Sequence, residues 1–446
     1  MRDKVKVNEL FSGIGAQHKA LDKIGIDYEI VGISDIDKYA NQSYAAMHGE
    51  VPQYGDISKV ERLEYADLWT YSSPCQDFSV SGKQRGLIDE NGNKTRSGLL
   101  LEVQRLLKVA KKEGTLPKYL LLENVKNLVG KKFKPDFDRW LQTLDELGYN
   151  TYWKVLNAKD YGVPQNRKRV FAVSIRRDLN QIFVFPEKEE LKVFIADILE
   201  SEVDEKYYIT DEKAEKLLST LSDKHISNAV RVGGRGSLDR HTWDLVAIGA
   251  SRGRNPENSS SETVGVSTEQ RFEINSQGTS NTLTSASKDN LVFEVKLSKI
   301  HRVPGNLYDR TKEGRFTDTQ VGRVYYPDGI SLTLDTMCEG NRQPKVLLKG
   351  DEPSVILDDT TGYREETLIY PDYAPTLRTT CFGLKTVQNA RIRRLTPLEC
   401  WRLMGFDDED FYKAKNSGVS DTQLYKQAGN SIVVDVLAKI FENLLK

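Results

Sequence analysis

The sequence is poor in the residues that build metal sites and disulfide frameworks. Its four cysteines are Cys75, Cys338, Cys381 and Cys400, and no two of them show a CxxC spacing. Its five histidines form no obvious ligand pair by spacing. Because structural zinc sites and disulfide scaffolds depend on such spacing, we expect neither a metal nor a disulfide framework. A functional cysteine, if there is one, would then be free to do chemistry.

Long apolar runs are also missing. No stretch of about 18 apolar residues is present, which is the length that a membrane-spanning helix needs. The start, MRDKVKVNELFSG, lacks the apolar core of a signal peptide. We therefore expect a cytoplasmic protein without a membrane partner. Its 446 residues suffice for two or three domains.

An excess of positive charge is the third absence. The formal net charge of −1 argues against a globally basic nucleic-acid binder. Cations do gather locally, at Arg167, Lys168, Arg169, Arg176 and Arg177. Such a run is often only a solvated face, but it is sufficient to neutralise a few phosphates of a duplex.

What is present, in the first 175 residues, is an alternation of strand-like and helix-like segments. A helix is indicated at about 97–112 by apolar residues at helical spacing before Gly114. This alternation predicts an α/β fold with a parallel, doubly wound sheet, in which ligands bind beyond the carboxyl ends of the strands. The predicted strands are 5–11, 28–34, 67–72 and 119–125.

Candidate site residues follow these strands. Gly13, Asp35, Cys75 and Glu123 all lie at predicted carboxyl ends, and therefore at one edge of the sheet. A lone cysteine is as often an inert core residue as a reactive one. A cysteine and a carboxylic acid at the ends of adjacent strands instead indicate a covalent active site.

The sequence pattern changes between about 180 and 390, where short β-prone runs are separated by Gly, Ser, Thr and Asn. Three TL-containing tetrapeptides recur there, at 282–285, 333–336 and 376–379. We interpret them as strand-loop-strand units of a separate β-rich domain, although chance recurrence in a Thr-rich stretch is the alternative.

Helical signals return at the C-terminal end. Thr396, Pro397 and Glu399 predict a capping box with proline in the first turn, opening a helix that runs to Gly405. Asn430 is predicted to cap a last helix with one apolar stripe. That stripe needs a core to dock on, so we expect it to return to the first domain.

Taken in order, the motifs of this chain resemble those of the DNA cytosine-5 methyltransferase family, of the bacterial or phage type. The resemblance implies a Rossmann-like sheet that binds S-adenosylmethionine in residues 1–178, completed by 391–446. It implies a large, β-rich target-recognition domain at 179–390. The motifs are FSGIG (11–15), Asp35, Asp56-Ile57, PCQ (74–76), SGKQRG (81–86), ENV (123–125), QNRKR (165–169), RRLTPLECWRLMGF (393–406) and KQAGNS (426–431).

The resemblance also implies the catalytic roles. Cys75 would be the nucleophile that adds to carbon 6 of cytosine, and Glu123 the acid at ring nitrogen 3. Arg167 and Arg169 would contact the base carbonyl and an adjacent phosphate. Cysteine suits this role because its thiolate is highly nucleophilic and its adduct can reverse.

The implied cofactor is S-adenosylmethionine, which leaves as S-adenosylhomocysteine, with no metal. Asp35 would bind the ribose and Asp56 the adenine amino group, while Ser431 would lie near the methionine moiety. The family often has Glu where this chain has the shorter Asp35. The implied cofactor-binding residues are Phe11, Gly13, Gly15, Asp35, Ile36, Asp56, Ile57, Pro74, Asn430 and Ser431.

The implied macromolecular partner is double-stranded DNA, from which the target base is rotated into the active site. The segment after Cys75 resembles the family's mobile loop that closes over the base, although an ordinary surface loop is the alternative. We expect a monomer that serves restriction-modification or protection of a phage genome. The implied DNA-contacting residues are Gln76, Ser79, Ser81, Lys83, Gln84 and Arg85.

Three other functions compete with this hypothesis. An RNA cytosine-5 methyltransferase would share the catalytic motifs, but the long insert at 170–392 favours duplex DNA. A catalytically inactive DNA-binding relative is opposed by the presence of Cys75, Glu123 and Arg169. An NAD oxidoreductase is disfavoured because FSGIG lacks the third glycine of the dinucleotide fingerprint. The recognised DNA sequence, and the number of targets, are not readable from the sequence.

Overall fold

The chain divides into two compact units. Unit 1 comprises Met1–Phe194, Thr282–Ser287 and Thr396–Lys446, and unit 2 comprises Ile195–Asn281 and Lys288–Leu395. The computed structural model describes residues 4–74, 78, 86–87, 95, 97–193, 195, 197–208, 279–280, 282–283, 291–292 and 393–446. It describes the backbone alone at 196, 245–254, 269–274, 281, 293–298, 301–302, 324–326, 345–346, 355–357, 368–370 and 384–392.

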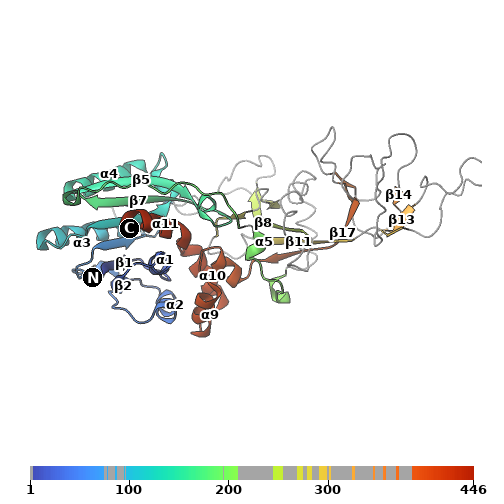
Figure 1. Ribbon diagram of the computed structural model, residues 1–446, viewed down its shortest axis with the longest axis horizontal. Coiled ribbons are helices and arrows are strands. Elements are labelled where there is room, and N and C mark those ends of the chain that lie inside the picture. Colours follow the sequence, from blue (N-terminus) through green and yellow to red (C-terminus); the bar gives the residue numbers. More distant parts are fainter. Residues whose placement is uncertain are drawn as a thin grey trace, which may run out of the picture. The chain divides into compact units, whose positions relative to one another are not determined.

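Unit 1 is built on a six-stranded sheet with the strand order β2-β1-β3-β4-β7-β5 (Figure 1). β1, β2, β3 and β4 run parallel to one another. The central sheet is mixed, and the fold is of the α/β class. The alternation of strands and helices in the sequence predicted this class and the first four strands. The strands are β1 (Val5–Leu10), β2 (Tyr28–Ser34), β3 (Leu68–Tyr71), β4 (Tyr119–Val125), β5 (Tyr149–Asn157) and β7 (Lys168–Arg176), and a short β6 (Gln165–Asn166) precedes β7.

The expected parallel arrangement holds for β1, β2, β3 and β4, but it does not extend to β7. β7 is antiparallel to both β4 and β5. The reason lies in the connection between β5 and β7, which contains only a 3-10 turn (Ala158–Tyr161) and the two-residue β6. A parallel pair needs a crossover of a dozen or more residues, so a connection this short makes the two strands antiparallel neighbours.

Helices of unit 1 follow the strands of the sheet. They are α1 (Ala16–Ile24), α2 (Lys38–His48), α3 (Leu100–Glu113) and α4 (Lys134–Leu147). Gly114 ends α3 in the left-handed conformation, as the sequence predicted. The interior side chains of α3 and α4 pack in one apolar core with Trp69, Leu120 and Leu122 of the sheet.

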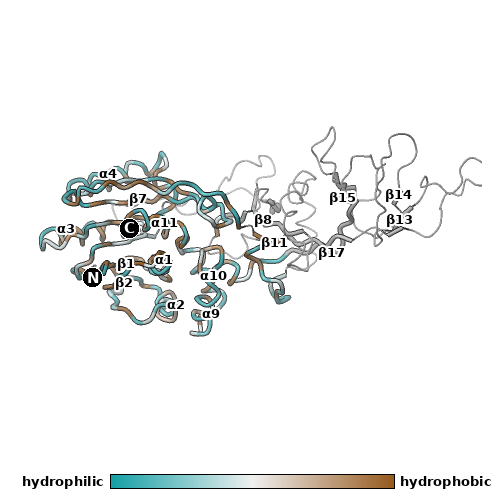
Figure 2. The backbone as a smooth tube through the Cα atoms, viewed as in Figure 1, coloured by the Kyte–Doolittle hydropathy of each residue, from teal (hydrophilic) through white to brown (hydrophobic). Residues whose placement is uncertain are grey.

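Burial of the central strands explains their apolar sequences. β4 is buried along five of its seven residues, which is typical of a strand covered on both faces. Figure 2 shows the brown, hydrophobic stretches that run along β1 and β7. Polar residues inside such strands are therefore unusual, and Glu9 and Glu123 are two of them.

The C-terminal segment completes unit 1 with four helices. In α8 (Pro397–Arg402), Thr396 and Glu399 form the predicted capping box, but the helix ends before Gly405. The others are α9 (Asp408–Asn416), α10 (Asp421–Asn430) and α11 (Val434–Leu445). The apolar stripe of α11 is buried, and Figure 1 shows α11, in red, beside α1, in blue. α11 belongs to unit 1 and packs against α1 within that unit.

The predicted cap of the last helix is wrong. Asn430 is the final residue of α10, because the Ser431 amide still donates to the Gln427 carbonyl at 3.0 Å. The backbone then becomes extended at Ser431 and Val433, and Val433 stands at the N-cap of α11. The predicted cap residue, Asn430, thus lies three residues before the residue that begins the last helix.

Unit 2 is rich in β-strands, as the composition predicted. One sheet has the order β16-β15-β17-β11-β8-β9 with antiparallel pairs, and another has the order β12-β13-β14. The described strands are β8 (Leu245–Arg254), β9 (Glu269–Ile274), β10 (Ser280–Asn281), β11 (Leu291–Ser298), β12 (His301–Arg302), β13 (Val324–Tyr326), β14 (Lys345–Val346), β15 (Val355–Leu357), β16 (Leu368–Tyr370) and β17 (Leu384–Arg394). The described residues also form a short helix, α5 (Ile195–Ile198), and a 3-10 turn (Glu205–Tyr207). Apart from residues 282–283, the proposed TL repeats lie outside the described residues.

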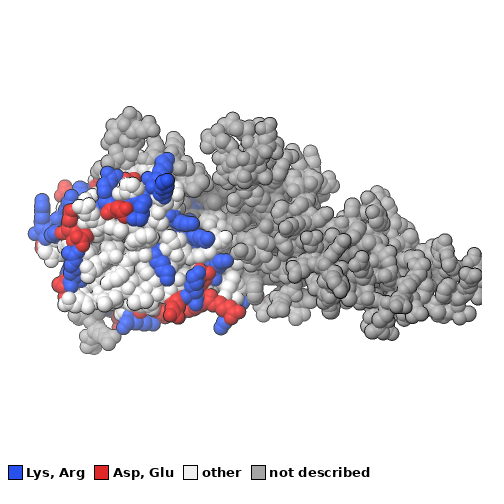
Figure 3. All heavy atoms as spheres, turned by 90° about the horizontal axis from the view of Figure 1, so that it is seen from above, with Lys and Arg blue, Asp and Glu red and all other residues white. Residues whose placement is uncertain are grey.

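The described surface carries both signs of charge. In Figure 3, blue cationic and red anionic side chains lie near one another over unit 1, without one extended basic face on the side shown. Among the described residues, no helix is both long and apolar enough to cross a bilayer.

Candidate active site

The turn after β1 is shaped by three residues with positive φ. Phe11, Gly13 and Gly15 have φ values of 59°, 55° and 78°. The backbone amide of Ser12 donates to the Ser34 carbonyl at 3.2 Å, which holds the turn against the end of β2. Two glycines allow this path, whereas Phe11 adopts a conformation that is costly for a bulky residue. Such strain is typical of a ligand-binding turn.

Asp35 fixes the same turn from the next strand. One carboxylate oxygen accepts from the Gly13 amide at 2.9 Å, and the other accepts from the Asp37 amide at 2.8 Å. Burial raises the pKa of Asp35, and these backbone donors oppose the rise. Beside it, the apolar side chain of Ile36 is 76% exposed. The end of β2 thus offers a carboxylate next to an exposed apolar surface.

Asp56 and Ile57 lie beside the end of β2. The Tyr54 amide donates to the Ile33 carbonyl at 2.8 Å, which ties this segment to the sheet. The Asp56 carboxylate is exposed and accepts from both the hydroxyl and the amide of Ser58, and the hydroxyl bond is the main cause of its lowered pKa. Ile57 is buried. Both predicted residues therefore lie at the same edge as Asp35.

Glu123 lies at the carboxyl end of β4 in an ion pair. Its Oε1 lies 3.2 Å from Nε of Arg169 on β7, and the Glu123 residue is only 8% exposed. Burial raises the pKa of Glu123, because desolvation outweighs the opposing charges of Arg169 and Arg167. A carboxyl group in such surroundings can hold a proton and release it to a bound substrate.

The end of β3 is fastened beside Glu123. Nδ2 of Asn124 donates to the Ser73 carbonyl at 3.1 Å, and the Ser97 hydroxyl donates to the Pro74 carbonyl at 2.7 Å. The segment that follows β3 and leads to position 75 is therefore bonded to Asn124, the residue next to Glu123. Cys75 itself lies outside the described residues, as do Gln76, Ser79, Ser81, Lys83, Gln84 and Arg85.

Arg167 has different surroundings from Arg169. It is 4% exposed, and its terminal nitrogens donate to the carbonyls of Leu283 at 3.0 Å, Gly429 at 3.1 Å and Ser431 at 2.7 Å. All four residues belong to unit 1. Arg167 thus joins the end of α10 to residue 283. These contacts make Arg167 a linker of backbone segments, a role that its sequence motif did not indicate.

α10 brings Asn430 and Ser431 toward the Asp35 edge. Gln427 donates to the Tyr39 carbonyl at 2.9 Å and accepts from the Ser43 hydroxyl at 3.0 Å. Asn430, at the end of the helix, is exposed, whereas Ser431 is buried. The C-terminal motif is therefore bonded to the segment that directly follows Asp35.

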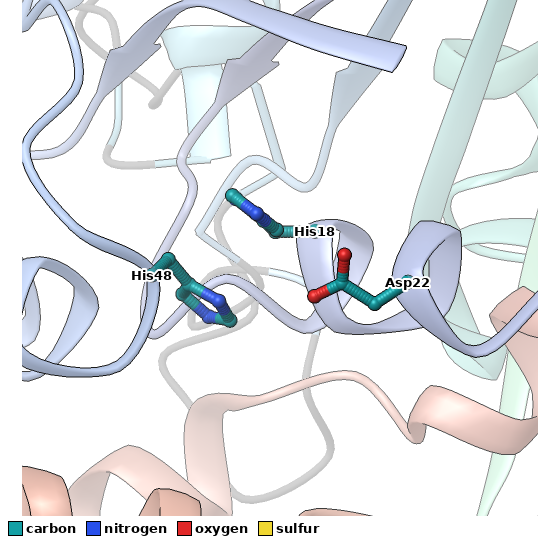
Figure 4. Close-up of side chains that lie close together, drawn as sticks. All are labelled: His18, Asp22 and His48. Carbon is teal, nitrogen blue, oxygen red and sulfur yellow. The ribbon is translucent and has the colours of Figure 1, made fainter. Parts of the chain in front are cut away.

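One cluster was missed by the sequence reasoning. His18, Asp22 and His48 each offer a ligand atom, and these atoms lie within 4.8 Å of one another (Figure 4). The expectation of no ligand pair rested on the spacing of the histidines, which does not bring His18 and His48 together. His18 and Asp22 are one turn apart on α1, and this spacing was the available signal. His48 comes from the end of α2, which spacing alone does not connect to α1.

Gly15 is packed against this cluster. A Cβ at this position would lie 2.7 Å from Nε2 of His48 and 2.8 Å from the Tyr44 ring, and the φ of 78° is itself unfavourable for other residues. We expect Gly15→Ala to displace the turn and to weaken binding of S-adenosylhomocysteine at least about tenfold. Calorimetric titration measures the effect. Gly25→Ala is the matched control, because it shares the positive φ but has open space around it. Equal affinities of the two variants would contradict this prediction.

The comparisons with known proteins agree on one family. A family model described as C-5 cytosine-specific DNA methylase matches residues 5–446. The chain is 34% identical to the orphan methyltransferase M.Rho11sI of Bacillus phage rho11s and 31% identical to the orphan methyltransferase M.SPBetaI of Bacillus phage SPbeta. Each match covers 99% of this chain and 98% of the relative. The type II methyltransferase M2.ScrFI of Lactococcus lactis subsp. cremoris is 29% identical, with 99% of both chains covered.

Solved structures agree on the fold. A Spodoptera frugiperda DNMT2 mutant matches with a TM-score of 0.54 and 18% identity, over 99% of this chain and 100% of that chain. The Entamoeba histolytica methyltransferase EhMeth matches with a TM-score of 0.52 and 17% identity, over 100% of both. The chain therefore belongs to the C-5 cytosine-specific DNA methylase family, and its enzyme class is DNA (cytosine-5)-methyltransferase.

Proposed function

We propose that this enzyme methylates carbon 5 of a cytosine that has been rotated out of duplex DNA, through a covalent adduct with Cys75. The thiolate of Cys75 forms a bond to carbon 6, and the electrons of the ring double bond make carbon 5 nucleophilic. Carbon 5 then takes the methyl group that S-adenosylmethionine would supply, and S-adenosylhomocysteine would be the product that leaves. Loss of the carbon 5 proton and departure of the Cys75 thiolate restore the aromatic ring.

The observation that carries this proposal is the buried Glu123–Arg169 pair. It lies beside the strand end that leads into Cys75, so an acid and a nucleophile enter the site from adjacent strands. With its pKa raised by burial, Glu123 would donate a proton to ring nitrogen 3 as carbon 6 is attacked. This donation prevents negative charge from building up on the ring.

The two arginines would then have different roles. Arg169 lies on the Glu123 carboxylate, where it would orient the acid and reach the base carbonyl or a phosphate. Arg167 would act as a positioning residue, because its terminal nitrogens donate hydrogen bonds to the carbonyls of Leu283, Gly429 and Ser431. It would hold the end of α10 close to the cofactor.

The turn after β1 fits S-adenosylmethionine. A Cβ on Gly13 would meet nothing within 4 Å, so the backbone is open to a ligand there. The exposed side chain of Ile36 would cover an adenine ring, and Asp35 would accept from ribose hydroxyls. Asp56 would accept from the adenine amino group, while Pro74, Asn430 and Ser431 would complete the site. Once bound, this cofactor supplies an electrophilic methyl group.

Target choice would belong to the β-rich part of the chain. We propose that residues 179–390 recognise the DNA sequence, and that 1–178 and 391–446 form the catalytic domain. The segment after Cys75 would close over the rotated base. We further propose a monomer that works in the bacterial cytoplasm. The names of the phage relatives favour an orphan enzyme that protects a phage genome.

A DNA duplex that contains 5-fluorocytosine tests the proposal, because it should trap the covalent adduct. Fluorine at carbon 5 cannot leave as the proton does, so the Cys75 adduct should persist once the methyl group has been transferred. We expect one duplex to remain bound per protein in denaturing electrophoresis, only when the methyl donor is present. A tRNA substrate under the same conditions is the control. Absence of a trapped duplex, or trapping of tRNA alone, would overturn the assigned reaction.

A further inference from the structure

A second polar site lies behind the turn after β1. The rings of His18 on α1 and His48 on α2 stack with a centroid distance of 4.2 Å and an angle of 18° between their planes. Asp22 lies one helical turn from His18, and Figure 4 shows its carboxylate beside the two rings. Two imidazoles and one carboxylate are a common donor set for transition metals.

His18 is held on one side by a chain of polar groups. Its Nδ1 lies 2.9 Å from the Tyr44 hydroxyl. The buried carboxyl of Glu9 lies against that hydroxyl, although not with the geometry of a regular hydrogen bond. This bond to Nδ1 fixes the orientation of the ring and leaves Nε2 for a ligand. Metal-binding histidines characteristically have such a partner on the second nitrogen.

The other two groups are held in the same way. Nε2 of His48 lies 3.3 Å from the Ile14 carbonyl, which leaves Nδ1 for a ligand. One oxygen of Asp22 accepts from the Tyr28 hydroxyl, which leaves the second oxygen. Each of the three side chains thus has one atom engaged by an outer partner and one atom available. This repeated pattern distinguishes the cluster from an accidental meeting of polar residues.

We propose that His18, Asp22 and His48 bind one divalent transition-metal ion, of the zinc or cobalt type. Imidazole nitrogens favour such ions over magnesium or calcium, which prefer oxygen ligands. Asp22 is exposed, so solvent reaches the cluster and water can complete the coordination. The stacked rings must turn about their Cβ–Cγ bonds before both nitrogens face one ion.

Metal titration of the full-length protein, with any affinity tag removed, tests the site. We expect Zn²⁺ to bind with a stoichiometry of one in calorimetry, and Co²⁺ to develop visible absorption bands at the same stoichiometry. Zn²⁺ should also raise the melting temperature, since it binds the folded state. A wild-type protein without saturable binding would overturn the proposal.

Three variants locate the ion. Asp22→Asn and His48→Gln should each weaken Zn²⁺ binding at least about tenfold, and the outer-partner variant Tyr44→Phe should weaken it about tenfold or more. Asp22→Asn changes an exposed side chain, so it keeps the test valid if a histidine variant fails to fold. His241→Gln is the matched control and should bind as the wild type does. Unchanged affinity in both Asp22→Asn and His48→Gln would place the ion elsewhere and refute the site.

Discussion

Replacing Cys75 by serine is expected to reduce methyl transfer by at least about 10⁴-fold while leaving the affinity for duplex DNA unchanged. The serine hydroxyl is almost entirely protonated at neutral pH, so it cannot add to carbon 6 as a thiolate does. Contacts to the DNA backbone do not depend on that atom. Transfer of a tritiated methyl group measures the first quantity, and a binding titration with labelled duplex measures the second.

The matched control is Cys400→Ser. Cys400 is buried in α8, and burial raises the pKa of its thiol well above the ordinary value, so it has no thiolate to offer. This variant should retain wild-type transfer once its folded fraction has been measured by circular dichroism. Wild-type turnover by Cys75→Ser would refute the assigned nucleophile. Loss of DNA binding in the same variant would instead indicate a structural role for Cys75.

Substitution of Glu123 by glutamine is expected to reduce transfer about 10²- to 10⁴-fold, the range typical of a lost general acid. Glutamine keeps the size of the side chain and a hydrogen bond to Arg169, but it has no acidic proton for ring nitrogen 3. Rates under single-turnover conditions measure this effect. They separate the chemical step from product release.

The pH dependence supplies a second, independent readout. Because the pKa of Glu123 is raised, the wild-type rate should fall on the alkaline side as Glu123 loses its proton, and the residual rate of Glu123→Gln should lack that fall. The raised pKa of Glu123 also makes the free energy of unfolding depend on pH. The folded protein holds this proton more tightly than the unfolded chain, so wild-type stability decreases as pH rises toward the raised pKa. The glutamine variant should not show this decrease.

Glu113→Gln is the control for these measurements. Glu113 is the exposed last residue of α3, so its removal should leave both the rate and its pH profile unchanged. An unaltered alkaline limb in Glu123→Gln would assign that limb to another group. Wild-type rates in Glu123→Gln would show that nitrogen 3 receives its proton from elsewhere.

Much of the catalytic fold could be predicted because its signals are local. The bounds predicted for β2 and β4 are those of the structure, and Thr396 and Glu399 form the capping box that their spacing indicated. The direction of β7 could not be predicted in the same way. A strand has the same period of two in either direction, so its orientation is decided by the length of the preceding connection.

The candidate site was predictable in position but not in its contacts. Gly13, Asp35 and Glu123 lie at carboxyl ends of strands, as the alternation of segments indicated. The separation of Arg167 from Arg169 was not readable, because two residues at this spacing share a face of a regular strand, whereas Arg167 lies between β6 and β7. Nor was the meeting of His18 and His48, since it depends on how α1 and α2 pack.

The packing of α11 against α1 has a consequence for biosynthesis. Lys23 pairs with Asp435, which lies 412 residues further along the chain. A ribosome adds about 5–20 residues per second, so α1 waits tens of seconds or longer for its neighbour. During that interval the apolar face that α11 will cover is open to water and to chaperones. Nascent chains stalled before residue 434 should therefore be far more sensitive to protease than released ones.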